Sequence, residues 1–296
     1  MKKNAVVLIF VAFVTCNLFA QNKIEYGSNP NAGKYINISD IKVYYETYGE
    51  GEPLLLLHGN SGSIESFIYQ IPAFSKHFKV IAVDSRAQGR TTDSEKEITY
   101  ALMASDMAEL IDRLNLGNVN VVGWSDGGNI GLELAFSHPE KVNKVVAIGA
   151  NYTHENYLAP PDSVVMPPDD PLIIRASAMI KRFSTAFERL SPDKTRKDII
   201  QKKLADLMEN YPNFTSDQLH TINVPFLIVA GDHDLININQ TVALFTNLPK
   251  ARLFIVPGAS HVVPAENPEL INSEVIKFLK TPYRDIDRYY FLKIPK

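Results

Sequence analysis

The stretch from residue 118 to residue 135 constrains the fold of this chain more than any other. A short apolar run leads into Gly123–Gly127 (Gly-Trp-Ser-Asp-Gly), and a segment with helical spacing of apolar residues follows. A glycine–x–serine–x–glycine pattern in this context predicts a sharp turn from a strand into a helix, with a strained serine at its centre. The pattern also arises by chance, in which case Ser125 is an ordinary serine in a glycine-rich turn. The rest of the chain has to decide between the two.

Strand-like and helix-like segments alternate on both sides of this turn. Residues 35–39 and 41–48 alternate apolar and polar side chains, which is typical of antiparallel edge strands. Several fully apolar runs are typical of buried parallel strands, and helical spacing of apolar residues lies between them. The expected buried strands are 54–57, 80–83, 118–122, 142–148, 225–230 and 252–256, and the expected helices include 64–78, 100–114, 237–248 and 269–279. This alternation predicts an α/β fold, a mostly parallel twisted sheet with helices on both faces.

The alternation is interrupted over residues 152–224. Prolines cluster near its start, and two helix-like segments follow at 172–190 and 193–210. The apolar stripe of the first segment favours a packed helical cap over a disordered excursion. We therefore expect residues 35–151 and 225–280 to form the core. Residues 281–296 form a basic and aromatic tail to which the sequence assigns no role.

The first twenty residues have the pattern of a signal peptide. Lys2 and Lys3 precede an apolar run, and Leu18-Phe19-Ala20 before Gln21 is an acceptable cleavage site, although Leu18 is less usual there than alanine. The apolar run is short for a membrane span, so we expect cleavage after residue 20, export to the periplasm or the exterior, and no stable membrane span afterwards. Lipid attachment at Cys16 is a minor alternative, because Thr15 stands where a small residue is usual. Residues 21–34 are expected to form a linker.

Composition excludes several classes of function. The net charge of −3 argues against a nucleic-acid partner, because phosphate binding requires a concentrated basic surface. Cys16 is the only cysteine, so the mature chain has neither a disulfide nor a cysteine nucleophile. The histidines are scattered without metal-ligand spacing, and no cofactor motif is evident. We expect a small-molecule substrate, no metal and no cofactor; the sequence does not indicate an oligomeric state.

Ser125, His261 and an aspartate form the candidate catalytic group. A serine hydroxyl needs a base within hydrogen-bonding distance, and the base needs an acid that orients it. His261 follows the last expected strand, and Asp232 and Asp234 follow the strand before it. We choose Asp234, because the turn points it back over the sheet, and assign Asp232 a structural role. The carboxyl ends of parallel strands share one edge, so these residues can meet there.

An oxyanion hole requires two N–H donors. The N–H of Asp126 at the start of the helix after Ser125 is one, and the turn after His58 provides the other, from Asn60 or alternatively Ser61. We expect His58 to brace that turn. Asp84 and Arg86 on a neighbouring loop are interpreted as a salt-bridged scaffold.

Five motifs together resemble the α/β-hydrolase fold superfamily over nearly all of residues 35–280. They are His58-Gly-Asn60, Asp84-x-Arg86-x-x-Gly89-x-Thr91, Gly123-Trp-Ser-Asp-Gly127, Gly231-x-x-Asp234, and Gly258-x-x-His261 with Glu266 after it. The resemblance implies the chain order serine, acid, histidine, with the acid three positions after the strand-end glycine, which supports Asp234. Ala87 stands where the family usually has glycine, and Thr91 where it usually has serine.

The resemblance leaves the substrate open. The turn Gly123–Gly127 is similar to that of valacyclovir-hydrolase-like esterases, which implies that Asp126 could receive a cationic substrate. Alternatively, Asp126 only stabilises the start of the helix. The cap residues Tyr152, Tyr157, Met166, Phe183 and Phe187 could line an apolar pocket. The first hypothesis is an exported serine carboxylic-ester hydrolase. The alternatives are a C–C bond or lactone hydrolase with the same triad, and a catalytically silent binding protein, against which the intact Ser, His and Asp argue.

Overall fold

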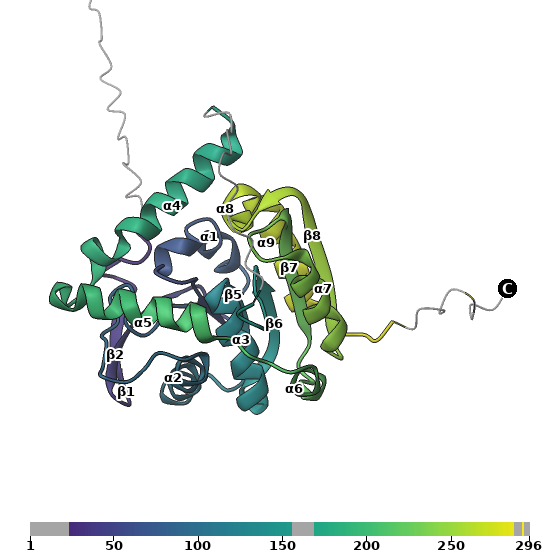
Figure 1. Cartoon of the computed structure of the whole chain (residues 1–296), viewed down its shortest axis with the longest axis horizontal. Helices are drawn as coiled ribbons and strands as arrows, with labels where there is room; N and C mark the ends of the chain where they lie inside the picture. The colour runs from purple at the N-terminus through teal and green to yellow at the C-terminus, as the bar shows by residue number, and fades with distance from the viewer. Residues whose placement is uncertain (1–23, 156–168, 287–291, 293–296) are drawn as a thin grey trace, which may run out of the picture.

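The computed structural model describes residues 24–155, 169–286 and 292 (Figure 1). In this part of the chain eight strands form one sheet in the order β1-β2-β4-β3-β5-β6-β7-β8. β1 pairs antiparallel with β2, β2 pairs antiparallel with β4, and the remaining pairs are parallel. The strands are β1 Gly33–Ile38, β2 Ile41–Tyr48, β3 Pro53–Leu57, β4 Lys79–Val83, β5 Val119–Trp124, β6 Val142–Ile148, β7 Phe226–His233 and β8 Ala251–Ser260. The α/β fold class predicted from the alternation is confirmed.

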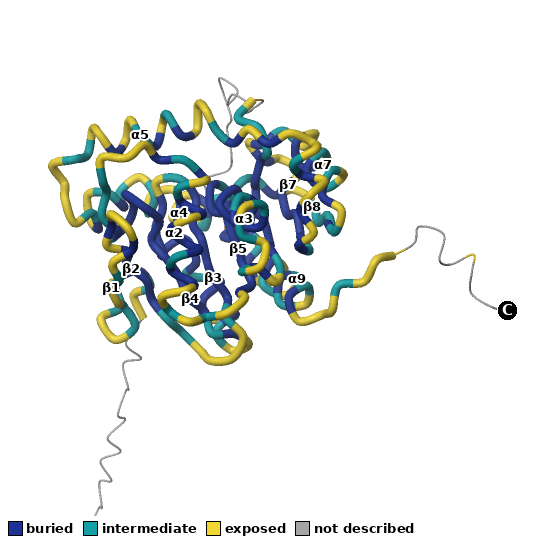
Figure 2. The backbone as a smooth tube through the Cα atoms, turned by 90° about the horizontal axis from the view of Figure 1, so that it is seen from below, coloured by how far each residue is buried: buried dark blue, intermediate teal, exposed yellow. Residues whose placement is uncertain are grey.

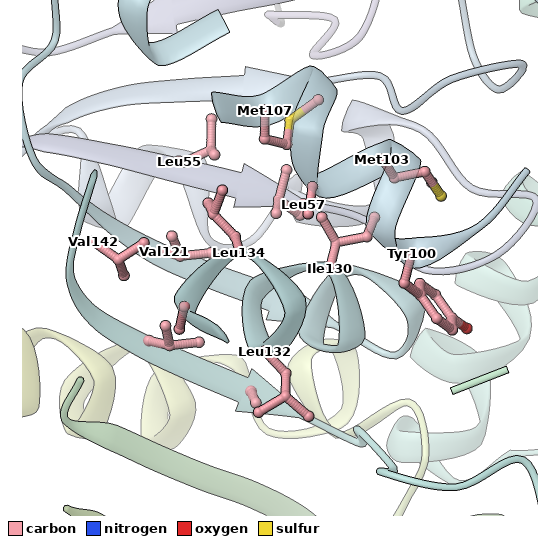
Figure 3. Packing of buried hydrophobic residues seen from close by; sticks show 14 of the residues in the cluster. Leu55, Leu57, Tyr100, Met103, Met107, Val121, Ile130, Leu132, Leu134 and Val142 are labelled. Atoms are coloured by element: carbon pink, nitrogen blue, oxygen red, sulfur yellow. The ribbon is translucent and has the colours of Figure 1, made fainter. Parts of the chain in front are cut away.

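Helices cover both faces of the sheet. Successive strand residues point to opposite faces, so Leu55 and Leu57 pack with α2 Tyr100–Arg113 and α3 Asp126–Ser137, as Figure 3 shows. Leu54 and Leu56 pack on the other face with α1 Ile71–Phe74 and α9 Pro268–Lys280. The sheet is therefore buried on both sides, and Figure 2 shows its strands in the dark interior.

The expected helix over residues 64–78 is wrong as one element. The chain forms a short 3₁₀ helix, η1 Ile64–Phe67, and then α1, with Pro72 in the first turn of α1. Proline lacks an N–H and fits the start of a helix better than its interior, so the apolar run divides there.

Two segment boundaries also differ from the expectation. Gly33 and Lys34 belong to β1 rather than to a linker, and the N–H groups of Gly27 and Asn29 donate to the buried carboxylate of Glu46. β8 continues to Ser260 through Pro257, which is tolerated because β8 is an edge strand. α7 Ile238–Asn247 and α8 Val263–Glu266 flank this strand along the chain. The 3₁₀ helix η2 Pro139–Lys141 precedes β6.

The cap contains the two predicted long helices, α4 Pro171–Leu190 and α5 Lys197–Asn210, joined by the 3₁₀ helix η3 Lys194–Arg196. Figure 1 shows both outside the sheet. A third helix, α6 Ser216–Thr221, falls within the predicted cap range 152–224 but lies against α3 and α7 of the core. Its Leu219 is fully buried in the core cluster, which also contains Leu207 of α5. The signal-peptide prediction for residues 1–20 falls outside the described residues.

Candidate functional site

Ser125 lies at the turn from β5 into α3 with a strained backbone. Its φ of 56° and ψ of −121° are in a region that residues with a Cβ rarely occupy. The flanking glycines make this turn possible, because a Cβ on Gly123 would collide with the backbone of Gly127, and one on Gly127 with the carbonyl of Leu57. The N–H of Ser125 donates to the carbonyl of Ile148 in the neighbouring strand, at 2.7 Å. The strand-to-helix turn predicted from the sequence is confirmed.

His261 and Asp234 are hydrogen-bonded at the same edge of the sheet. Nδ1 of His261 lies 2.7 Å from Oδ1 of Asp234. Asp234 is buried, and the N–H of Ile236 donates to the same carboxylate oxygen at 2.9 Å. Because a carboxylate accepts at this position, Nδ1 carries the ring proton and Nε2 is left as the basic nitrogen.

Two residues next to this pair connect it to Ser125. The indole N–H of Trp124, which directly precedes Ser125, donates to the carbonyl of His261 at 2.9 Å. Gly149 follows Ile148 with φ of 59°, and a Cβ on it would lie 2.8 Å from Cε1 of His261 and 3.3 Å from Oδ2 of Asp234. The ends of β5, β6, β7 and β8 thus bring Ser125, Asp234 and His261 to one edge, as the predicted sheet required.

Asp232, the other acid considered, has different partners. Its Oδ1 accepts from the N–H of Gly258 at 2.7 Å and lies 2.6 Å from Nδ1 of His233, whose side chain is exposed. These contacts join the ends of β7 and β8, which is the structural role expected for Asp232. Glu266 braces the same region, accepting from both the N–H and the hydroxyl of Ser260.

The two residues predicted to supply oxyanion donors lie side by side. Nδ2 of Asn60 donates to Oδ2 of Asp126 at 2.9 Å and to the carbonyl of Leu204 in the cap helix α5 at 3.3 Å. Asp126 begins α3, so its N–H is in the first turn, where N–H groups lack an intrahelical acceptor. The turn Gly59–Gly62 places Gly59 against Ser125, since a Cβ there would lie 3.6 Å from Ser125 Oγ.

The carboxylate of Asp126 is held within the protein. Besides Asn60, the hydroxyl of Tyr100 donates to it, at 2.8 Å, and the residue is only 3% exposed. Burial raises the pKa of Asp126, while the bonds from Tyr100 and Asn60 oppose that shift. Both carboxylate oxygens already accept hydrogen bonds. The carboxylate therefore fits a role in joining the turn at Ser125 to the turn at Asn60 better than a role as a receptor for a cation.

His58 braces the same turn, as expected. Its Nδ1 lies 2.8 Å from the carbonyl of Gly59, and its Nε2 lies 3.0 Å from the N–H of Ser85. Nε2 must accept the proton of Ser85, so the ring is the neutral tautomer with its proton on Nδ1. Burial lowers the pKa of His58 to about 4.

Asp84 and Arg86 do form a buried loop scaffold, but they do not pair with each other. The carboxylate of Asp84 accepts the N–H groups of Ile64 and Arg90, each at 2.8 Å. Arg86 instead donates to Asp106 and Asp40. Ala87 in this loop has φ of 64°, a left-handed conformation that favours glycine, which accounts for the glycine that is usual there in the family the motifs resemble.

A cavity of about 140 Å³ lies between the core and the cap. Phe183 and Phe187 line it, as does part of the turn after Asn60. Phe183 also stacks near Trp124, with ring centroids 5.3 Å apart. Tyr152 does not line this cavity; it packs against the core, and its carbonyl accepts from the N–H of Phe214. Tyr157 and Met166 lie outside the described residues.

The cap is fastened to the core at two buried carboxylates. Arg189 of α4 donates to both oxygens of Glu65, at 2.7 and 2.6 Å. Asp93, whose side chain is 1% exposed, accepts from Arg196 and from Lys203 of α5. These ion pairs hold the two cap helices that line the cavity against the core.

Metal and membrane features are absent from the part of the chain that the structure describes. Within residues 24–155 and 169–286 there is no group of three histidine, cysteine or acidic side chains that could hold a metal ion. Among the described helices, none has the length and apolar character needed to cross a bilayer.

The sequence did not indicate the roles of Tyr100 and Gly149, the hydrogen bond of the Trp124 indole, or the ion pairs that hold the cap. The sequence places Tyr100 only at the start of an expected helix, and a hydroxyl at that position is the one local signal of its role. Glu65 and Arg189 are 124 residues apart, and no local pattern links them.

The comparisons with known proteins point to one family. The family model for the alpha/beta hydrolase fold matches residues 52–201, half of the chain. A putative esterase/lipase of Haemophilus influenzae is 26% identical over 237 residues, covering 76% of this chain and 82% of that protein. A 2-hydroxy-6-oxononadienedioate/2-hydroxy-6-oxononatrienedioate hydrolase of Burkholderia vietnamiensis is 26% identical over 283 residues, covering 83% of this chain and 95% of that protein.

A solved structure gives the same result for the fold. The crystal structure of a hydrolase from Pseudomonas aeruginosa PA01 superposes with a TM-score of 0.70 at 21% identity, covering 86% of this chain and all of that one. The relatives act on different substrates, as their names state, so the comparisons support hydrolysis more firmly than any particular bond.

Proposed function

This chain belongs to the alpha/beta hydrolase fold family, and on that premise we propose that it is a serine hydrolase that cleaves carboxylic esters. The observation that carries the proposal is the hydrogen bond of 2.7 Å between His261 Nδ1 and Asp234 Oδ1, at the sheet edge where Ser125 stands on a strained turn. A base oriented by an acid, at the same sheet edge as a serine on a strained turn, is the arrangement that nucleophilic catalysis needs.

The mechanism follows from these positions. Ser125 Oγ attacks the ester carbonyl, and His261 Nε2 takes the hydroxyl proton and later gives it to the departing alcohol. Asp234 keeps the ring proton on Nδ1 and stabilises the charged imidazole. The N–H groups of Asn60 and Asp126 stabilise the oxyanion of the tetrahedral intermediate. Water then hydrolyses the acyl-enzyme through the same base.

The oxyanion assignment gains support from the contact between the two donor residues. The side-chain bond of 2.9 Å from Asn60 to Asp126 fixes the turn relative to the start of α3. Preorganised donors contribute more than mobile ones, because they need no rearrangement as charge develops.

Hydrolysis of p-nitrophenyl esters from acetate to decanoate tests the proposal. The protein lacking residues 1–20 is compared with its Ser125→Ala variant, and both are treated with a fluorophosphonate probe. We expect turnover and labelling in the parent only. Equal rates in both proteins, together with no labelling of Ser125, would overturn the assignment and favour a catalytically silent binding protein.

A C–C bond or lactone hydrolase with the same residues is the second candidate. The relative from Burkholderia vietnamiensis, which aligns over 95% of its own length, favours it. A panel of vinylogous diketones and lactones separates the candidates. If the probe labels Ser125 while simple esters are not cleaved, this second candidate takes first place.

We also propose that the protein is exported. Lys2, Lys3 and the apolar run after them support a cleavable signal, with lipid attachment at Cys16 as the minor alternative. Expression of the full chain in a bacterium, followed by fractionation and intact mass, tests this. We expect a periplasmic or secreted protein that begins at Gln21, whereas a cytoplasmic protein with an intact N-terminus would rule export out.

A further inference from the structure

The loop that carries His261 has to return across the sheet towards Ser125. His261 follows β8, whereas Ser125 follows β5, and β6 and β7 lie between these two strands. Neighbouring strands lie about 4.8 Å apart, so three spacings separate β5 from β8 by about 14 Å. The position of His261 relative to Ser125 therefore depends on contacts that hold this loop over the intervening strands.

The ends of the three strands β7, β6 and β5 each provide one such contact. Asp234, after β7, bonds to the His261 ring at Nδ1, over 2.7 Å. Gly149, after β6, leaves room for the ring, since a Cβ there would lie 2.8 Å from Cε1. Trp124, the last residue of β5, donates its indole N–H to the main-chain carbonyl of His261 at 2.9 Å. Of the three, only the indole bond joins the backbone of His261 to the strand that leads to Ser125.

The main chain on either side of His261 is held by bonds of a different kind. The N–H of Ser260 donates to Glu266 at 2.8 Å, and the N–H of Val262 donates to the Ser260 hydroxyl at 3.1 Å. These bonds join residues that are close in the sequence, so they fix the shape of the loop. The indole bond adds what they do not provide, a link between the loop and β5.

The indole of Trp124 is buried and makes full use of its one polar group. The residue is 1% exposed and belongs to an apolar cluster that also contains Ile148 and Val263. An indole has a single hydrogen-bond donor and no acceptor. The bond to His261 therefore satisfies the whole hydrogen-bonding capacity of this side chain, and no other orientation of the ring is favoured by a second bond.

Helix α4 of the cap packs on both sides of this bond. Phe183 of α4 lies against the indole, with ring centroids 5.3 Å apart and an angle of 58° between the rings. Met179, one turn earlier, belongs to the same apolar cluster as Val263, with which α8 begins just after His261. Figure 1 shows α4 beside α8, and the two helices are in contact. The cap therefore packs on the indole and on the segment that follows the base.

We propose that Trp124 is a positioning residue for the base His261, and that Phe183 of the cap holds the indole in the orientation that makes the bond. The inference rests on the proposed function and adds its regulation, because the packing of α4 on Trp124 then sets the position of the base. A shift of about 1 Å in a catalytic group can lower a rate about 100-fold, so small changes in this packing affect turnover.

The first experiment removes the indole N–H and keeps an aromatic ring. In Trp124→Phe we expect kcat for p-nitrophenyl butyrate to fall about tenfold, while KM stays within about twofold of the parent. The rate at which a fluorophosphonate probe labels Ser125 should fall by the same factor, because both reactions need His261 to accept the Ser125 proton. If Trp124 only filled the core, the folded protein would keep its kcat and its labelling rate.

Phe74→Leu is the control for a loosened core. Phe74 of α1 is fully buried in the same apolar cluster as Trp124, but its side chain has no polar group that could bond to His261. This variant also loses buried apolar surface, and its kcat should stay within about twofold of the parent. Equal losses of kcat in the two variants, or an unchanged kcat in Trp124→Phe, would overturn the proposal.

Proton exchange tests the same contacts without any ester turnover. Trp124 is the only tryptophan of the chain, so one NMR resonance reports its indole proton. In a Ser125→Ala background, Phe183→Leu should speed exchange of this proton with solvent about tenfold. Phe187, one turn further along α4, packs against the other apolar cluster, so Phe187→Leu should leave that exchange rate unchanged. Trp124→Phe in the same background should speed exchange of the His261 Nδ1 proton about tenfold.

These exchange rates separate the inference from the proposed function. The expected rates in a protein that neither cleaves esters nor reacts with the probe would uphold the positioning role and reject the ester hydrolase. Turnover and labelling by the parent, with exchange rates that neither Phe183→Leu nor Trp124→Phe changes, would uphold the hydrolase and reject the positioning role. If Trp124→Phe does not fold, the indole exchange in Phe183→Leu decides alone.

Discussion

The sheet edge and the cap are held in place by different physical means. At the edge, the candidate catalytic residues follow buried strands, and backbone bonds such as that from Ser125 N–H to Ile148 set their positions. The cap helices lie outside the sheet. They pack apolar side chains such as Met179 and Leu207 on the core and are fastened by ion pairs at Glu65 and Asp93. Backbone hydrogen bonds between strands allow little movement of the residues at the strand ends, whereas a side-chain ion pair can be replaced by substituting its two residues.

This difference indicates how one fold can keep its chemistry while its substrates vary. Substitutions in the cap can change the cavity without altering the strand ends, because the cap helices are joined to the core by side chains and not by strand pairing. Asn60 is one residue that contacts both, through Asp126 at the edge and through the carbonyl of Leu204 in the cap. Four predictions test the comparison.

The largest effect is expected where a side chain would enter the edge itself. In Gly149→Ala the new Cβ would lie 2.8 Å from Cε1 of His261, so the ring must move. We expect kcat/KM for p-nitrophenyl acetate to fall about 100-fold, because displacements of about 1 Å in a catalytic group can cost that much.

Gly117→Ala is the control for backbone strain. Gly117 also has a positive φ, of 67°, but nothing lies within 4 Å of its added Cβ. Its activity should stay within about twofold of the parent. Equal losses in both variants would mean that strain, not displacement of His261, is responsible.

The pH dependence of stability tests the brace at His58. Its pKa is about 4 in the folded protein, because the ring is buried, against about 6.5 in an unfolded chain. The unfolded state therefore binds more protons between these values, and stability is lost as the pH falls from 6.5 towards 4. The loss is expected to reach about 2–3 kcal/mol.

Urea unfolding between pH 7.5 and pH 4.5 measures this loss. In His58→Gln, whose amide does not titrate, the free energy of unfolding should fall by that much less over this pH range. Identical slopes for the parent and His58→Gln would show that His58 is not protonated on unfolding in this range.

Substitutions of two neighbouring lysines of α5 test the ion pairs that hold the cap. Lys203 bonds to the buried carboxylate of Asp93 at 3.1 Å, while Lys202 pairs with Asp206 on the surface. Lys203→Met should lower the free energy of unfolding by about 1–2 kcal/mol, because Asp93 loses one of its cations. Lys202→Met should cause no measurable change.

Hydrogen exchange shows where the loss occurs. Amide protons of α5 should exchange faster in Lys203→Met than in the parent, while those of β5 and β6 should not. Faster exchange throughout the sheet would mean that cap and core unfold together, which contradicts the comparison.

The smallest effect is expected at the junction of the two regions. An amide in place of the Asp126 carboxylate cannot accept from both Tyr100 and Asn60, so Asp126→Asn should loosen the Asn60 turn. We expect kcat/KM to fall about tenfold. The factor should be the same for p-nitrophenyl butyrate and for its 4-amino derivative, which is cationic. A loss confined to the cationic ester would instead identify Asp126 as its receptor.

Much of the core was predictable because its signals are local. The apolar runs and the glycines around Ser125 predicted strands, a turn and their order, and the structure bears these out. The one long helix predicted over residues 64–78 is wrong because Pro72 fits the first turn of a helix and not its interior, which the apolar spacing does not indicate.

The sequence by itself determined the α/β architecture and the place of Ser125, Asp234 and His261 at strand ends, because periodicity and turn chemistry act over a few residues. Only the tertiary structure decided which side chains meet across the molecule. Asn60 and Asp126 are 66 residues apart, and Lys203 and Asp93 are 110 apart. Such pairs depend on how whole elements pack, and so does the cavity between the core and the cap.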